Sequence, residues 1–192
     1  MTTNAQQDLL SRAVSLHQAG RLNEAADIYR AVLAAEPKNA AALKLLGTAY
    51  FQVGNPEEGA QLLGLSLEID PAQPEAANNR GIALRQLTRH IEALASFEQA
   101  IELKPDYAEA YNNRANALQA LERLDDALVS YDRAIKLRPN YAEAYRNRGN
   151  ALRRLGRLDD ALESYDQAIA FAPSNADAYH EPERRTAIIR TL

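Results

Sequence analysis

Prolines recur at one fixed interval along most of the chain, and this periodicity restricts the fold more than any other feature. Pro37, Pro71, Pro105, Pro139 and Pro173 each lie 34 residues after the one before. A repeat of this length is typical of stacked supersecondary units, each of which buries its apolar face against its neighbours. Because proline cannot continue a helix, each of these residues is expected to end a unit.

Alignment on the prolines divides 170 of the 192 residues into five tandem units of 34. The fourth and fifth units are identical at 22 of 34 positions. The units cover residues 6–39, 40–73, 74–107, 108–141 and 142–175, and a divergent tail follows at 176–192. We therefore predict a single domain over residues 1–192, in which the tail forms a short helix that caps the array.

Each unit contains two amphipathic segments separated by a turn. In the last unit, apolar residues follow at spacings of three and four from Tyr145 to Leu155, and again from Leu158 to Ile169. Gly156 between the two segments is typical of a helix stop, and no run alternates with the period of a strand. The sequence thus predicts an all-α fold. The expected helix pairs lie near residues 6–35, 40–69, 74–103, 108–137 and 142–171.

Small residues occupy one position of the first segment in every unit. This column consists of Ala13, Gly47, Gly81, Ala115 and Gly149. Small side chains let helix axes approach toward the short end of the range of about 8–10 Å. The second unit also has Gly59 and Gly64 in its second segment, where each glycine should cost about 1 kcal/mol relative to alanine. That unit is expected to be the least stable, unless the glycines permit tighter packing.

These repeated residues resemble the tetratricopeptide repeat. In the last unit the matching residues are Ala142, Glu143, Ala144, Tyr145, Gly149, Leu152, Ala161, Tyr165, Ala168 and Pro173. The resemblance covers all but a short head and tail. It implies a right-handed superhelical solenoid of antiparallel helix pairs, with a concave groove lined mainly by the first helix of each pair. It also implies a scaffold that binds a peptide or protein partner in this groove.

Composition and motifs argue against other classes of protein. The chain has 22 basic and 26 acidic residues, a net charge of −4, which is untypical of nucleic-acid binders. It has no cysteine, and its three histidines fall in different columns, so we expect no metal site. No catalytic motif, secretory leader or membrane-spanning apolar run is present. We predict a cytoplasmic protein that is not an enzyme, uses no cofactor and does not insert into membranes.

Asparagine occupies one column of the first segments in three successive units. Its members are Asn79, Asn113 and Asn147. Asparagine is a poor residue for a helix interior, and stacking would turn this column into a ladder. An amide can bridge the N–H and C=O groups of an extended peptide. The column resembles the asparagine ladder in the repeat domain of O-GlcNAc transferases, and removing its amides is expected to weaken binding with little effect on stability. The alternative is that the amides bridge neighbouring repeats.

The family resemblance places further polar residues on the groove. They are Asn78, Asn112, Asn116, Asn150, Lys44, Arg85, Arg146, Arg153 and Arg154, with Gln119 beside them in the fourth unit. The groove would be apolar at the first unit, rich in amides in the middle and basic at the last unit. Arginine binds carboxylates well, so an acidic partner segment fits the basic end. A carboxylate clamp of the chaperone-binding type is not expected, because Thr48, Asn112 and Asn116 replace its residues.

Arginine forms another column in the last three units, with an acidic residue 18 positions later. The pairs are Arg80 with Glu98, Arg114 with Asp132, and Arg148 with Asp166. We expect ion pairs between the two helices of each unit, with a structural role.

Two functions other than a peptide-binding scaffold are consistent with the sequence. The chain can be the substrate-binding module of a larger glycosyltransferase-type enzyme, or a scaffold that assembles through the exposed ends of the array. If Ile188, Ile189 and Leu192 of the tail dock on the last unit, the protein is a monomer, which is the expected state. If the tail is too short to cover that unit, a weak homodimer is expected instead.

Overall fold

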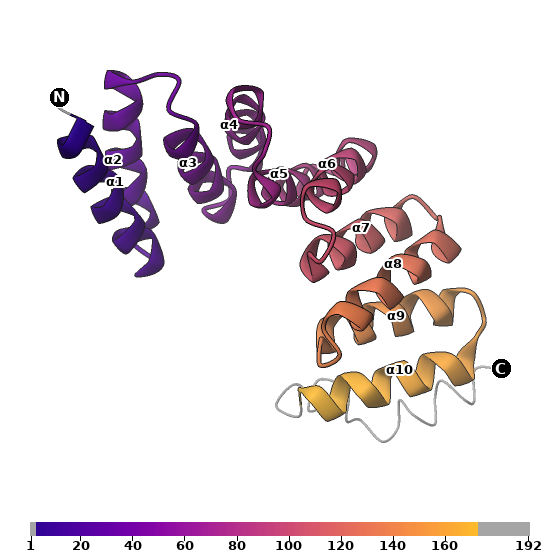
Figure 1. Ribbon diagram of the computed structural model, residues 1–192. Coiled ribbons are helices and arrows are strands. Elements are labelled where there is room, and N and C mark those ends of the chain that lie inside the picture. The colour runs from indigo at the N-terminus through magenta and orange to yellow at the C-terminus, as the bar shows by residue number, and fades with distance from the viewer. Residues whose placement is uncertain (1–2, 173–192) are drawn as a thin grey trace.

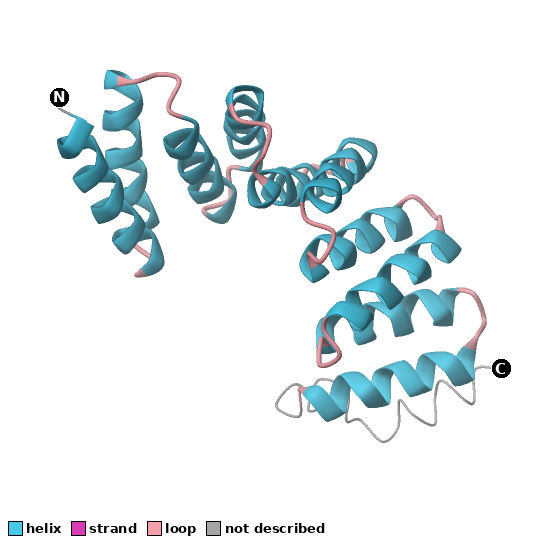
Figure 2. Cartoon of the chain, in the orientation of Figure 1, coloured by secondary structure: helices cyan, strands magenta, loops and turns pink. Residues whose placement is uncertain are grey.

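The computed structural model describes residues 3–172, and within this range it contains ten α-helices and no β-strand (Figure 2). The helices are α1 (Thr3–Gln18), α2 (Leu22–Ala35), α3 (Ala40–Gln52), α4 (Pro56–Ile69), α5 (Pro74–Gln86), α6 (His90–Leu103), α7 (Ala108–Ala120), α8 (Leu124–Leu137), α9 (Ala142–Arg154) and α10 (Leu158–Phe171). The predicted all-α fold is confirmed. Every helix pair begins and ends where the sequence predicts, except that α1 begins at Thr3. The expected capping helix at 176–192 lies outside the described residues.

The turn between the two helices of each repeat uses the same left-handed backbone position. Gly20, Gly54 and Gly156 have φ angles of 76°, 91° and 75° at this position. In the third and fourth repeats the position is occupied by Thr88 and Glu122, with φ angles of 59° and 61°. A side chain is disfavoured in this conformation, so these two turns are strained by comparison with the other three.

The helices follow one another along a curved path from α1 to α10 (Figure 1). Each helix contacts the next one along the chain. Beyond these neighbours, contacts in the described part of the chain join only first helices of successive repeats, from α1 to α3, α5, α7 and α9 in turn. The first helices therefore form the inner line of the arc and the second helices the outer line, which is a helical solenoid.

The first four repeats each bury one large side chain of the second helix against a small residue of the first helix, and Tyr165 at the same position of the fifth repeat is partly exposed. Tyr29, Leu63, Phe97 and Tyr131 are fully buried in this way. A Cβ atom added to Gly81 would lie 2.5 Å from the Phe97 ring, and one added to Gly149 would lie 2.6 Å from the Tyr165 ring. The small residues of the first helices are therefore required by the large side chains of the second helices that pack against them.

The arginine column contacts serine rather than the predicted acidic residues. Arg80, Arg114 and Arg148 donate to the hydroxyl oxygens of Ser96, Ser130 and Ser164 at 3.4, 2.9 and 2.6 Å. The prediction of an ion pair within each unit is wrong for Arg148, which instead pairs with Asp132 of the preceding repeat at 2.6 Å. Asp132 follows Ser130 by two residues in α8. Because successive residues are rotated by about 100° around a helix axis, these two side chains point in nearly opposite directions. Ser130 therefore faces Arg114 of its own repeat, and Asp132 faces Arg148 of the next repeat.

Candidate functional site

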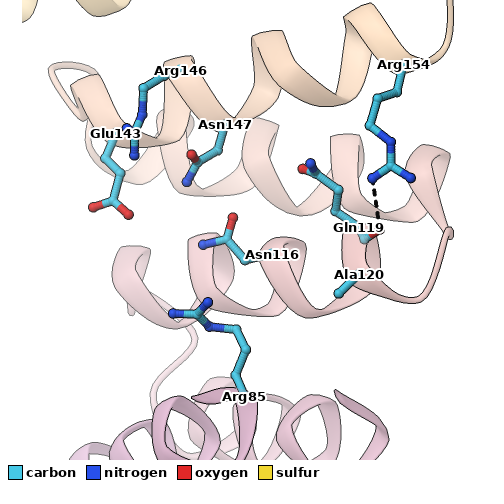
Figure 3. Close-up of a pocket in the computed structure, with 8 residues that line it drawn as sticks. All are labelled: Arg85, Asn116, Gln119, Ala120, Glu143, Arg146, Asn147 and Arg154. Carbon is cyan, nitrogen blue, oxygen red and sulfur yellow. Dashed lines mark hydrogen bonds between the residues drawn. The ribbon is translucent and has the colours of Figure 1, made fainter. Parts of the chain in front are cut away.

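A pocket of about 400 Å³ opens between the first helices of the last three repeats (Figure 3). Its lining residues are Arg85 of α5, then Asn116, Gln119 and Ala120 of α7, then Glu143, Arg146, Asn147 and Arg154 of α9. All of these helices belong to the inner line of the arc. The pocket therefore exists only because three repeats are stacked in this order.

The pocket brings together part of the predicted groove. The predicted residues that line it are Arg85, Asn116, Gln119, Arg146, Asn147 and Arg154. The other candidates do not line it, namely Lys44, Asn78, Asn79, Asn112, Asn113, Asn150 and Arg153.

Two lining residues, Ala120 and Glu143, were not predicted from the sequence. Glu143 lies in the first turn of α9, where an acidic residue is normally explained by the helix dipole. The sequence feature that could have identified Glu143 is its position three residues before Arg146, which places both side chains on the same face of the helix.

The asparagine column joins neighbouring repeats. The Nδ2 atoms of Asn79, Asn113 and Asn147 donate to Thr48 Oγ1 at 3.2 Å, to Asn78 Oδ1 at 3.0 Å and to Asn112 Oδ1 at 3.2 Å. Each bond crosses from one repeat to the one before it. This is the alternative that the sequence left open, and it gives these amides a structural role. Of the three, Asn147 also lines the pocket.

The acceptors Asn78 and Asn112 are buried, with 4% and 1% of their surface exposed. They therefore lie beneath the groove and not on its surface, in contrast to the expectation. Asn112 also donates to Glu143 Oε1 at 3.5 Å, so α9 both donates to and accepts from the same asparagine. This contact holds the Glu143 carboxylate at the pocket.

A buried tyrosine orients two of the amides that line the pocket. The Tyr131 hydroxyl oxygen lies 2.6 Å from Asn116 Oδ1 and 3.0 Å from Gln119 Oε1, so its one hydrogen is shared between these two acceptors. Burial raises the pKa of Tyr131, Glu143 raises it further, and Arg85 opposes the rise. The hydroxyl group thus stays protonated and keeps both carbonyl oxygens turned toward it. The same arrangement recurs in the last repeat, where the Tyr165 hydroxyl donates to Asn150 Oδ1 at 2.8 Å.

The arginines of the pocket have different surroundings. Arg154 donates to the main-chain oxygen of Gln119 at 3.1 Å and forms an ion pair with Glu122 of the preceding repeat. The Nε atom of Arg85 is buried and has no hydrogen-bond partner among the described residues. Figure 3 shows Arg146 and Glu143 at one end of the pocket and Arg154 at the other. The site is therefore polar and positively charged, with amide donors at its centre.

Metal-binding clusters and membrane-spanning helices are both absent from the described part of the chain. Residues 3–172 contain no group of histidine and carboxylate side chains placed to hold a metal ion. No helix within the same range is both long enough and apolar enough to cross a membrane.

Family models and solved structures identify this architecture. Models described as tetratricopeptide repeats match residues 16–80, 83–122 and 112–176. A crystal structure of MamA is 25% identical, covers 86% of this chain and 96% of its own, and superposes with a TM-score of 0.78. A second MamA structure is 24% identical, covers 94% and 97%, and has a TM-score of 0.79.

A crystal structure of YrrB, described as a TPR protein with an unusual peptide-binding site, is 23% identical. It covers 91% of this chain and 90% of its own, with a TM-score of 0.75. No curated protein sequence matches in a direct comparison. The repeat models together span most of the chain, and the solved structures share its arc of helix pairs. The chain belongs to the tetratricopeptide repeat family.

Proposed function

We propose that this protein is a non-catalytic scaffold that binds an extended segment of a partner protein along its concave face. The pocket between α5, α7 and α9 is the observation that carries this proposal. Its lining residues come from three repeats in succession, so a bound segment would run across the first helices rather than along one of them. The peptide-binding site described for YrrB supports the same use of this fold.

The amides at the centre of the pocket suit the backbone of such a segment. Because the carbonyl oxygens of Asn116 and Gln119 both lie against the Tyr131 hydroxyl group, their NH₂ groups are the atoms left to face the groove. An NH₂ group can donate to the carbonyl oxygens of an extended peptide without regard to its side chains. These amides would contribute affinity, and the charged residues around them would contribute selectivity.

The charges favour a partner segment with acidic groups. Three arginines and one glutamate line the pocket, which leaves it positive. Arginine binds carboxylates through two parallel hydrogen bonds, so the basic part of the groove would select acidic partners. The asparagine column no longer favours the substrate-binding module of a glycosyltransferase-type enzyme, because its amides bridge repeats.

A steric block of the pocket tests the proposal. Ala120 lines the pocket and is exposed, so Ala120→Trp would fill it without disturbing the core. Ala95, which is exposed on α6 and does not line the pocket, gives the matched control Ala95→Trp. Peptides selected from a displayed library on the wild-type protein should bind the control and lose binding to Ala120→Trp, with unchanged melting temperatures. Equal binding to both variants, or a selection that yields no binding peptide, would contradict the proposal.

A further inference from the structure

The inner and outer lines of the arc carry opposite charges. The five first helices contain 4 acidic and 9 basic residues, whereas the five second helices contain 15 acidic and 3 basic residues. Within residues 3–172, seven of these 15 acids form ion pairs, mostly with arginines of the turns. The other eight leave the outer line acidic.

Two large apolar side chains are exposed on the second helices of the middle repeats. Ile91 of α6 is 74% exposed and Val129 of α8 is 66% exposed, so neither is part of the core. The other repeats have Asn23, Glu57, Asp125 and Asp159 at the position of Ile91, and Asp27, Gln61, Ala95 and Glu163 at the position of Val129. The fold therefore accepts polar side chains at both positions, and its own packing does not account for the apolar ones.

Ile91 begins an exposed stripe along α6. Ala95, Glu98 and Glu102 follow it at spacings of four, three and four residues, which places all four side chains on one face of the helix. Among the described residues, neither Glu98 nor Glu102 has an ion-pair partner, so the stripe changes from apolar to negatively charged. Val129 occupies the position of Ala95 in the next repeat and extends the apolar part onto α8.

The charge of this face restricts what can bind to it. The same face of a second copy would bring like charges together, and a surface of anionic lipids would be repelled for the same reason. A segment with lysine or arginine side chains is attracted by complementary charge. An apolar side chain on that segment would also remove the Ile91 side chain from water.

We propose that the outer face of α6 and α8 is a second docking surface, which binds a basic segment of a partner protein. The segment places an apolar side chain against Ile91 and Val129, and its lysines or arginines against Glu98 and Glu102. Because this surface belongs to the second helices, it leaves the groove on the first helices free for another partner. The inference therefore does not depend on the proposed function of the groove.

Two peptides of twelve residues serve as probes. Both are acetylated and amidated at their ends and contain four lysines among alanine and serine residues. One has two leucines four positions apart, and the other has serine in their place, so the two peptides have the same charge. Nuclear magnetic resonance titration of the full chain measures each affinity. It follows the methyl signals of Ile91 and Val129, the backbone amides of α6 and α8, and those of the groove helices α5, α7 and α9 for comparison.

We expect the leucine peptide to bind the wild type about fivefold more tightly than the serine peptide, because only leucine provides the apolar contact. Both peptides should shift the signals of α6 and α8. Replacing Glu98 and Glu102 together by glutamine should weaken both peptides by about fivefold, since two attractive charges are removed.

Ile91→Asp is the decisive variant, because apolar contact and charge predict opposite changes. Aspartate stands at this position in the fourth and fifth repeats, so the variant should fold. The leucine peptide should bind it about fivefold more weakly, although the face has gained a negative charge that attracts lysine. Val129→Glu, which reproduces Glu163 of the fifth repeat, should act in the same direction. Ala31→Asp adds the same charge to the exposed surface of α2 and is the control, with less than about a twofold effect.

Each other result would contradict the inference. Equal affinities of the two peptides for the wild type would mean that the face has no apolar anchor. Tighter binding of the leucine peptide to Ile91→Asp would mean that charge alone attracts it. Shifts confined to α5, α7 and α9 would place the basic segment in the groove. Methyl signals of Ile91 and Val129 that change with protein concentration in the absence of peptide would mean that the face joins two copies of this chain.

The groove-blocking variant Ala120→Trp separates this inference from the proposed function. The leucine peptide should bind it as tightly as it binds the wild type, because Ala120 lies on a first helix and the docking surface on second helices. Weaker binding to Ala120→Trp would show that the peptide uses the groove and would overturn the inference. A groove that binds no selected peptide would contradict the proposed function and leave this surface unaffected.

Discussion

Gly47 of α3 and Gly59 of α4 face each other through their backbones. A Cβ atom added to Gly59 would lie 2.8 Å from the Gly47 carbonyl oxygen, and one added to Gly47 would lie 2.9 Å from the Gly59 carbonyl oxygen. Gly64 of the same helix has no such contact, because its added Cβ would lie 3.5 Å from Arg80 Nε. The sequence left open whether the extra glycines of the second repeat permit tighter helix packing. They do so at Gly59 and do not at Gly64.

The two glycines of α4 should respond in opposite directions to alanine. Gly59→Ala would force α3 and α4 apart and should lower the free energy of unfolding by about 1–3 kcal/mol. Gly64→Ala should raise it by up to about 1 kcal/mol, because alanine favours the helix and fits at a normal contact distance. Urea unfolding followed by circular dichroism measures both. Shifts in the same direction would mean that backbone contact does not decide the difference.

Relief of the strained turn of the third repeat should stabilise the protein. Thr88→Gly removes a side chain from a left-handed position and should raise the free energy of unfolding by about 0.5–1 kcal/mol, allowing for the extra freedom of glycine in the unfolded chain. Glu122→Gly relieves the same strain in the fourth repeat but loses the ion pair with Arg154, so its gain should be smaller. Thermal unfolding of the two variants compares them. A lower melting temperature for Thr88→Gly would show that the threonine side chain contributes more than the strain costs.

Removal of the asparagine column should now affect stability, in contrast to the expectation from the sequence. Asn79→Ala, Asn113→Ala and Asn147→Ala each delete a bond between repeats, at a cost of about 0.5–1.5 kcal/mol per bond. Asn140→Ala, in the exposed loop before α9, is the control and should have little effect. Equilibrium unfolding in urea measures the combined variant. An unchanged midpoint would mean that these bonds contribute nothing net and that the amides serve the groove alone.

Tyr131 and Tyr141 should ionise late when the pH is raised, and burial also raises the pKa of Tyr29 and of Tyr107. Burial raises the pKa of Tyr131, and it raises the pKa of Tyr141 to about 12, with Glu143 adding to the second effect. In the unfolded chain both titrate near pH 10, so the stabilisation that they provide is complete below about pH 10. It is lost as the pH rises from there through the pKa values of the folded state. Spectrophotometric titration should show a delayed phase coinciding with unfolding. Tyr131→Phe and Tyr141→Phe together should reduce its amplitude, leaving the part that comes from Tyr29 and Tyr107. A single phase near pH 10 in the folded wild type would contradict the assignment.

The last described helix provides a test of the tail. Leu162 and Tyr165 of α10 are partly exposed, whereas the equivalent Leu128 and Tyr131 are 7% and 0% exposed. We predict that the full chain is a monomer and that deletion of residues 173–192 makes it self-associate, because more of this apolar face then contacts water. Sedimentation over a range of concentrations measures the change. A full chain that is a dimer and becomes a monomer on deletion would mean that the tail joins two copies instead of capping one.

The helices were predictable because the signals that begin and end them are local. Proline at a fixed interval and glycine in the turn act on the residues beside them, and the outer bounds of the five helix pairs agree with the prediction except at the start of α1. The contacts between repeats were not predictable. The sequence paired Arg148 with an acid of its own repeat, but the direction of a side chain around the helix axis sends it to Asp132 of the repeat before.

The sequence by itself determined the repeat, the helix pairs, the small and large columns that pack them, and the family, since each follows from residues within one unit or from its recurrence. The tertiary structure decided which of the groove residues meet. Glu143 comes from the third of three stacked helices, and its nearness to Arg146 was visible in the sequence, whereas its place opposite Arg85 was not. The separation of such side chains depends on how far each repeat is rotated relative to the last, and small differences in packing add up over three repeats to decide which charges share a pocket.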